Sequence, residues 1–74
     1  MLVKYDDQVI NMDKVLEFGP VDDEKREFPF QIRFISEGDA YLEMRFLYAE
    51  TRKNMMKRIL DAYLADEKLL DLDE

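Results

Sequence analysis

"FPFQIRFIS" (residues 28–36) and "AYLEMRFLY" (residues 40–48) are the most regular segments of this 74-residue sequence. In each of them every second residue is apolar, a period typical of a β-strand that buries one face. The apolar positions are Phe28, Phe30, Ile32 and Phe34 in the first segment, and Ala40, Leu42, Met44 and Phe46 in the second. The two segments therefore predict an antiparallel hairpin whose even-numbered side chains face the core.

The register of this hairpin follows from the even numbers, because paired residues must have an even sum if both apolar sets are to share a face. A connection of Ser36, Glu37 and Gly38 meets this condition and places glycine where such a loop needs a left-handed backbone. The pairs expected from this connection are Phe34 with Ala40, Ile32 with Leu42, and Phe30 with Met44.

The opposite face of the hairpin carries polar side chains. The expected register places Arg33 beside Tyr41, in reach of a cation–π contact, and brings Arg33 diagonally close to Glu43. This face is interpreted first as a solvated surface with ordinary cross-strand pairs. The alternative is a protein-docking surface, since arginine and tyrosine favour interface hot spots; its residues would be Arg33, Tyr41, Arg45 and Leu47.

The residues before the hairpin predict further strands. Segments 2–5 and 8–12 are β-compatible, with Asp6 and Asp7 as a turn between them. "KVLEFGPVDD" (residues 14–23) predicts another strand, ended or bulged at Gly19 and Pro20, and "DDEKRE" (residues 22–27) a charged loop.

From Ala49 onward the apolar period becomes helical. With Met56 at the centre, one stripe falls within about 60° of it and is expected to cover the sheet; its members are Ala49, Ile59, Leu60, Tyr63 and Leu70. The predicted fold is therefore α+β and forms a single domain over residues 1–74. It consists of an antiparallel β-meander of four or five strands (residues 1–48), one C-terminal helix packed on its apolar face (49–68) and an acidic tail (69–74).

A second helical stripe, Met55, Ala62 and Leu69, has seven-residue spacing. Together with Leu64 it widens the apolar arc to about 220°, more than one sheet requires. Either the twisted sheet wraps around the helix, or these three residues meet the same helix in a second copy. A small chain without cysteine has reason to dimerise, because no disulfide stabilises it.

The charges of the helix run against its dipole, which favours acids at the start and bases at the end. Residues 49–60 contain four basic residues and one acid, a net charge of +3, and residues 61–74 contain six acids and one base, a net charge of −5. Three interpretations apply to Arg52, Lys53, Lys57 and Arg58. They neighbour an acidic sheet, they pair with the acidic half of an antiparallel second helix, or they bind phosphate or nucleic acid.

The sequence lacks residues that several kinds of catalytic or binding site require. The sequence has no histidine or cysteine, and its glycines stand alone, so neither a nucleophile–base pair nor a phosphate loop is expected. The acidic clusters lack the spacing of a calcium loop. We therefore expect no enzyme, no cofactor and no metal site. No signal peptide or membrane span is recognised, so a cytoplasmic protein is expected.

The leading functional hypothesis is a small protein-interaction module that self-associates, as a homodimer, through its helix. The first alternative is binding of nucleic acid or phosphate by the basic start of the helix, which the net charge of −7 opposes. The second alternative is an acidic inhibitor or mimic that occupies a basic site on a larger protein.

Overall fold

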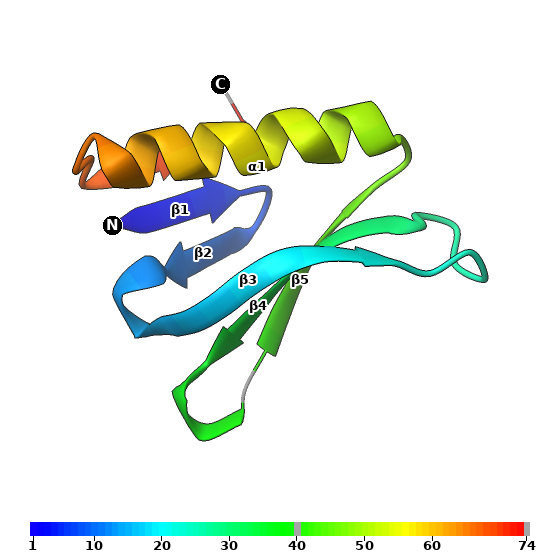
Figure 1. Cartoon of the computed structure of the whole chain (residues 1–74), viewed down its shortest axis with the longest axis horizontal. Coiled ribbons are helices and arrows are strands. Elements are labelled where there is room, and N and C mark those ends of the chain that lie inside the picture. The colour runs from blue at the N-terminus through cyan, green and yellow to red at the C-terminus, as the bar shows by residue number, and fades with distance from the viewer. Residues whose placement is uncertain (40, 74) are drawn as a thin grey trace.

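The computed structural model describes residues 1–39 and 41–73 (Figure 1). Within them the chain forms six strands and one α-helix, so the predicted α+β class is confirmed. The strands and the helix are β1 (Leu2–Tyr5), β2 (Gln8–Asn11), β3 (Val15–Asp22), β4 (Phe30–Ser36), β5 (Tyr41–Phe46), α1 (Ala49–Leu64) and β6 (Leu69–Asp71). Short 3-10 helices, Met12–Lys14 and Glu37–Asp39, lie before β3 and between β4 and β5.

The strands form two sheets with the orders β2-β1-β6 and β3-β4-β5. All neighbouring strands are antiparallel except β1 and β6, which are parallel. The N-terminal hairpin thus leaves the expected meander and pairs with the end of the chain. Figure 1 shows α1 along one side of the molecule, above the strands of both sheets.

The β4–β5 hairpin has the predicted face but not the predicted register. Phe34 pairs with Leu42, Ile32 with Met44 and Phe30 with Phe46, two residues beyond the expected partners. Ala40, the expected partner of Phe34, lies outside the described residues. The 3-10 turn Glu37–Asp39 lengthens the connection, so the ladder closes at Ile35 and Tyr41. Gly38 has the expected left-handed backbone, with φ of 81°.

The predicted end or bulge at Gly19 and Pro20 is wrong, because β3 continues through both residues to Asp22. An edge strand tolerates proline, since only one side of its backbone joins the ladder. The irregularity instead lies between Val15 and Glu17. It leaves Leu16 without a partner in the ladder, as in a β-bulge.

The hydrophobic core lies between α1 and the two sheets. It consists of Val3, Ile10, Met12, Ile32, Phe34, Met44, Phe46, Ile59 and Leu72. On the helix, Met55, Met56, Ile59 and Ala62 face this core, whereas Ala49, Leu60 and Tyr63 are exposed. The buried stripe is therefore rotated by about 60–70° from the one expected around Met56.

The helix ends at Leu64, not at residue 68, in a Schellman motif. The Glu67 amide donates to the Ala62 carbonyl (3.0 Å), and the Asp66 amide donates to the Tyr63 carbonyl (3.1 Å). Asp66 occupies the left-handed position of this motif, with φ of 58°. The chain turns back there, so Leu69 continues into β6 and not along the helix.

Residues 69–74, expected to be an acidic tail, include the third strand of the N-terminal sheet, while Glu74 lies outside the described residues. The Leu2 amide donates to the Lys68 carbonyl and the Leu72 amide to the Lys4 carbonyl, both at 2.9 Å. The Asp73 carboxylate accepts hydrogen bonds from Lys4 Nζ (2.7 Å) and from the Asp6 amide (2.9 Å). The Asp73 carboxylate therefore holds the β1–β2 turn in place through Lys4 and Asp6.

Asp66→Gly should raise the free energy of unfolding by about 1 kcal/mol, because an L-residue is strained in the left-handed conformation and glycine is not. Urea denaturation measures the change. Ala65→Gly is the matched control, since Ala65 has an ordinary φ of −85° and glycine there only adds entropy to the unfolded chain. A loss of stability in Asp66→Gly would show that the Asp66 carboxylate contributes more than its backbone strain costs.

Asp73 should contribute pH-dependent stability. The hydrogen bond from Lys4, and then that from the Asp6 amide, lower the pKa of Asp73. Its contribution is therefore fully present above the pKa of an unfolded aspartate, about 4, and disappears as the pH falls through the lower folded pKa. In urea denaturation at pH 7, the free energy of unfolding of Asp73→Asn should be lower than that of wild type. The two values should converge as the pH falls towards 2.

Asp7→Asn, a charge change at an exposed neighbouring position, is the control for the Asp73 measurement. Equal pH dependence of the two variants would mean that general charge repulsion, and not the Lys4–Asp73–Asp6 contact, causes the effect.

Candidate protein-interaction surfaces

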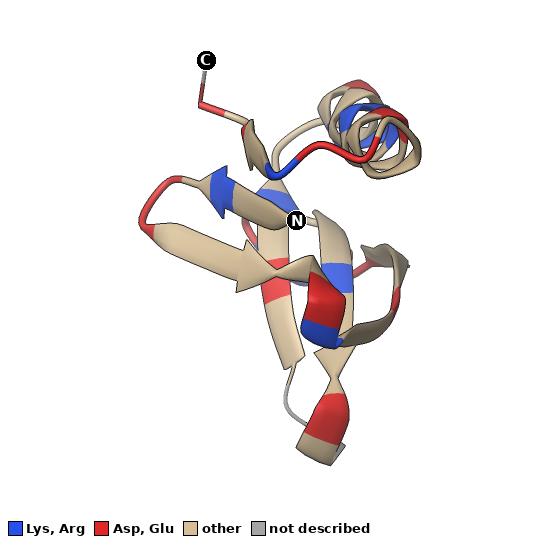
Figure 2. Cartoon of the chain, turned by 90° about the vertical axis from the view of Figure 1, so that its left-hand side faces the viewer, with Lys and Arg blue, Asp and Glu red and all other residues tan. Residues whose placement is uncertain are grey.

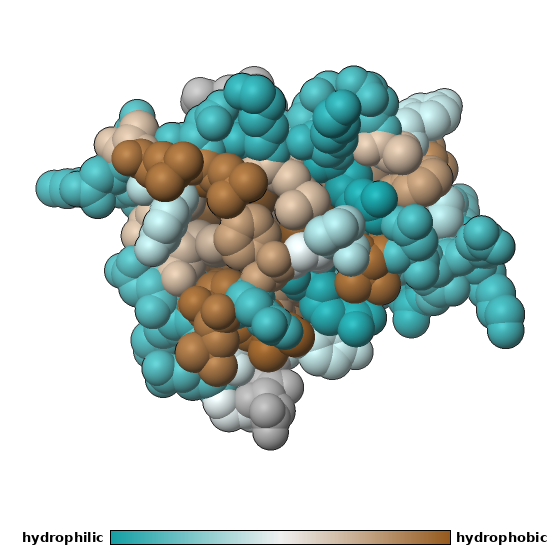
Figure 3. All heavy atoms as spheres, viewed as in Figure 1, coloured by the Kyte–Doolittle hydropathy of each residue, from teal (hydrophilic) through white to brown (hydrophobic). Residues whose placement is uncertain are grey.

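Apolar side chains gather on one face of the molecule, over the C-terminal half of α1 and the beginning of β3 (Figure 3). The exposed large residues of these elements are Leu60, Tyr63 and Leu64 of α1 and Leu16 of β3, here called the apolar face. Leu64 is 80% exposed and Leu16 is 69% exposed, so neither contributes to the core. An exposed apolar surface of this kind is typical of a contact site for another molecule.

Two local features of the fold create the apolar face. The rotation of α1 turns Leu60 and Tyr63 away from the core, and the bulge in β3 releases Leu16 from the ladder. The over-wide apolar arc of the helix indicated surplus apolar surface, but not which side of it would be buried. Nothing in the sequence predicted the position of the bulge, so Leu16 was missed.

The predicted self-association stripe does not form one exposed surface. Ala62 is buried and Met55 packs against the core. Leu69 is exposed, but it lies in β6 beside Leu2 and not on the helix. Self-association through α1 remains a prediction, and the residues of α1 accessible for it are those of the apolar face.

Two residues of the basic cluster bind elements of the same chain. Arg52 donates to the Val21 carbonyl (3.2 Å), pairs with the Asp22 carboxylate and lies over the Phe30 ring at 5.4 Å. Arg58 donates to the carbonyls of Asp71 (3.2 Å) and Leu72 (3.5 Å). These two cations connect α1 to the end of β3 and to β6.

The other two basic residues lie on the outer side of α1. Lys57 pairs with Asp61 one turn later, at 2.8 Å, and this contact raises the pKa of Lys57. Lys53 is exposed. The four cations therefore do not converge on one site.

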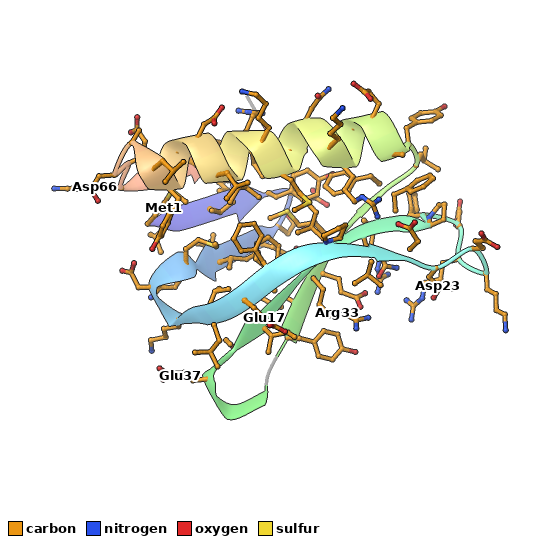
Figure 4. All side chains as sticks on the ribbon, in the orientation of Figure 1. Met1, Glu17, Asp23, Arg33, Glu37 and Asp66 are labelled. Carbon is orange, nitrogen blue, oxygen red and sulfur yellow. The ribbon has the colours of Figure 1, made fainter. Side chains whose placement is uncertain are left out.

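The outer face of the β3-β4-β5 sheet carries a polar network around Glu43. Arg33 donates to Glu43 at 3.1 Å, Arg45 donates to it at 3.5 Å, and Arg33 lies over the Tyr41 ring at 5.2 Å. The cation–π contact and the Arg33–Glu43 contact were both expected, although in the observed register Arg33 faces Glu43 directly. Figure 4 shows Arg33 on the side of the sheet turned away from α1.

A groove with a volume of about 800 Å³ adjoins this network. It is lined by the β1–β2 turn (residues 5–8), by β5 (residues 41–45), and by Arg26 and Phe28. Of the predicted sheet-face residues, the groove includes Tyr41 and Arg45; Arg33 lies beside them, and Leu47 is exposed just beyond the end of β5. Burial, followed by the nearby charges of Asp6 and Asp73, raises the pKa of Tyr5 in the groove wall.

Over residues 1–39 and 41–73, no cluster of three or more acidic side chains has the geometry to hold a metal ion. In the same part of the chain, no helix is long and apolar enough to span a membrane. In comparisons with known proteins, no family model, no curated protein and no solved structure matches this chain. Function must therefore be argued from its surfaces.

Glu43→Gln should lower the free energy of unfolding by about 1–2 kcal/mol, because it leaves Arg33 and Arg45 without their anion at a largely buried position. Urea denaturation at neutral pH measures the loss. Asp61→Asn is the control, since its pair with Lys57 is exposed to solvent and should contribute much less than the Glu43 contacts. Equal effects in the two variants would contradict a structural role for the Glu43 network.

Proposed function

We propose that this protein is a small, non-enzymatic protein-interaction module that binds another protein through its apolar face. The proposal is carried by the high exposure of Leu16 and Leu64, together with the apolar patch that Figure 3 shows over the C-terminal half of α1 and the beginning of β3. Complete burial of an exposed leucine contributes about 1.5–3 kcal/mol. A few such residues supply enough free energy for specific binding.

The charge around the apolar face favours a partner with basic residues. The α1 residues of the apolar face, Leu60, Tyr63 and Leu64, lie at or next to the beginning of segment 61–74. This segment carries six acids and one base. Asp66 and Glu67 are exposed beside the apolar face, whereas the exposed Asp61 is paired with Lys57 at 2.8 Å. A complementary partner would present apolar side chains flanked by lysine or arginine, as an amphipathic basic helix does. A second copy would bring the same acids and is disfavoured at this surface.

The basic start of α1 gives less support to nucleic-acid binding, because Arg52 and Arg58 already bind groups of the same chain. The absence of histidine and cysteine from the sequence supports a non-enzymatic role. A cytoplasmic location remains part of the proposal, on the basis of the sequence alone.

Binding of two synthetic amphipathic helical peptides, one of leucine and lysine and one of leucine and glutamate, tests the proposal. The leucine–lysine peptide should bind wild type at least tenfold more tightly than the leucine–glutamate peptide. Leu16→Gln with Leu64→Gln should weaken that binding about tenfold or more while leaving the fold intact, since both side chains are already exposed. Isothermal titration calorimetry measures the affinities.

Leu69→Gln is the matched control, because Leu69 is an exposed leucine in β6, outside the apolar face. Equal weakening by Leu69→Gln, or unchanged affinity in the Leu16 and Leu64 variant, would refute the apolar face as the binding surface. A wild-type mass that rises with concentration and becomes monomeric in the Leu16 and Leu64 variant would identify a second copy as its occupant instead.

A further inference from the structure

One edge of β5 has no strand partner within the described residues, because β5 ends the order β3-β4-β5. An unpaired strand edge is a template for another strand. We propose that a second copy of the chain pairs its own β5 antiparallel to this edge, joining two three-stranded sheets into one across a twofold axis. This interface goes beyond the proposed function, since it uses a different surface from the apolar face.

The sequence of this edge is complementary to itself. Residues 41–47 read "YLEMRFL", with an acid one position before Met44 and a base one position after it. If Met44 lies opposite Met44 of the second copy, Glu43 lies opposite Arg45, Leu42 opposite Phe46, and Tyr41 opposite Leu47. Both copies then contribute the same contacts, as a twofold interface requires.

Neighbouring registers lack this complementarity. A shift of the second copy by two residues places Glu43 opposite Glu43, or Arg45 opposite Arg45, and like charges directly opposite are destabilising. A shift by one residue places the core face of one strand beside the outer face of the other. The charges therefore select one register among the nearest alternatives, because the shifted registers bring like charges together.

In the single chain, Glu43 and Arg45 differ in how exposed they are and in how closely they are paired. Glu43 is 9% exposed and bound by Arg33 at 3.1 Å, whereas Arg45 is 51% exposed and reaches Glu43 only at 3.5 Å. Arg45 can therefore turn towards Glu43 of the second copy while Arg33 keeps its own Glu43 in place. Because residues 41–47 carry one acid and one base, the net charge of −7 lies elsewhere on the chain.

The core face of β5 is incomplete at one end. Leu42 is 44% exposed, whereas Met44 is 1% exposed and Phe46 3% exposed. The β1–β2 hairpin covers the Phe46 end, where the rings of Tyr5 and Phe46 lie 5.5 Å apart, and Figure 2 shows the hairpin extending beyond the other sheet. In the antiparallel pair, the Phe46 end of one copy lies beside Leu42 of the other. Each hairpin would then cover the partner's exposed leucine.

The other edge of this sheet is protected against pairing. β3 contains Pro20 and has its irregularity between Val15 and Glu17, and both features discourage strand addition. β5 has neither a proline nor a bulge.

Charge exchange between two single variants tests the register. Wild type should show a monomer–dimer equilibrium by analytical ultracentrifugation. Glu43→Arg and Arg45→Glu should each raise the dimer dissociation constant about tenfold or more, because each change acts twice in a twofold interface. An equimolar mixture of the two variants should regain wild-type affinity as a heterodimer, since positions 43 and 45 are both arginine in one variant and both glutamate in the other.

Glu17→Arg and Lys53→Glu, which change net charge equally at exposed positions away from β5, should leave dimerisation within about threefold of wild type. Circular dichroism establishes that each variant is folded, and regained affinity in the mixture cannot arise from misfolding. A wild type that stays monomeric up to millimolar concentration overturns the proposal. So does a dimer unaffected by Arg45→Glu, or a mixture of variants that does not associate.

Discussion

The structure depends on burying the core face of the β4–β5 hairpin. Ile32 and Phe34, at the centre of β4, are almost completely buried, and so are Met44 and Phe46 of β5. One amphipathic helix covers a stripe and not a whole twisted sheet. The remaining cover comes from the N-terminal sheet, which contributes Val3 and Ile10, and from Leu72 after β6. The first and last strands of the chain are thus needed to complete one core.

Tertiary contacts also account for two of the four basic residues of the helix. In an isolated helix, basic residues near the start oppose the dipole. In this fold Arg52 reaches the acidic end of β3, and Arg58 binds the carbonyls of Asp71 and Leu72 at the end of β6. Both arginines therefore attach α1 to strands of different sheets. The charge order of α1 is also less reversed than the sequence indicated, because α1 ends at Leu64, before most acids of segment 61–74, and has Glu50 in its first turn.

The two proposed interaction surfaces consist of apolar and strand-edge groups that the core does not bury. The rotated buried stripe of α1 leaves Leu60 and Tyr63 exposed, and Leu16 is exposed at the bulge in β3. On the other sheet, the free edge of β5 and the exposed Leu42 lie beside the groove walled by the β1–β2 turn. The first surface is proposed to bind a partner with basic flanks, and the second an identical strand. A chain of 74 residues can present both because they lie on separate elements.

The α+β class, the shared face of β4 and β5, the left-handed backbone of Gly38 and the helix start at Ala49 could all be predicted from the amino-acid sequence. These are local properties, set by period-two and helical patterns and by turn chemistry. The β4–β5 register, the rotation of α1 and the pairing of Leu69–Asp71 with β1 could not, and they became visible only in the folded chain. Each of these depends on contacts between residues distant in sequence. A period fixes which residues share a face, but not which face another element will cover.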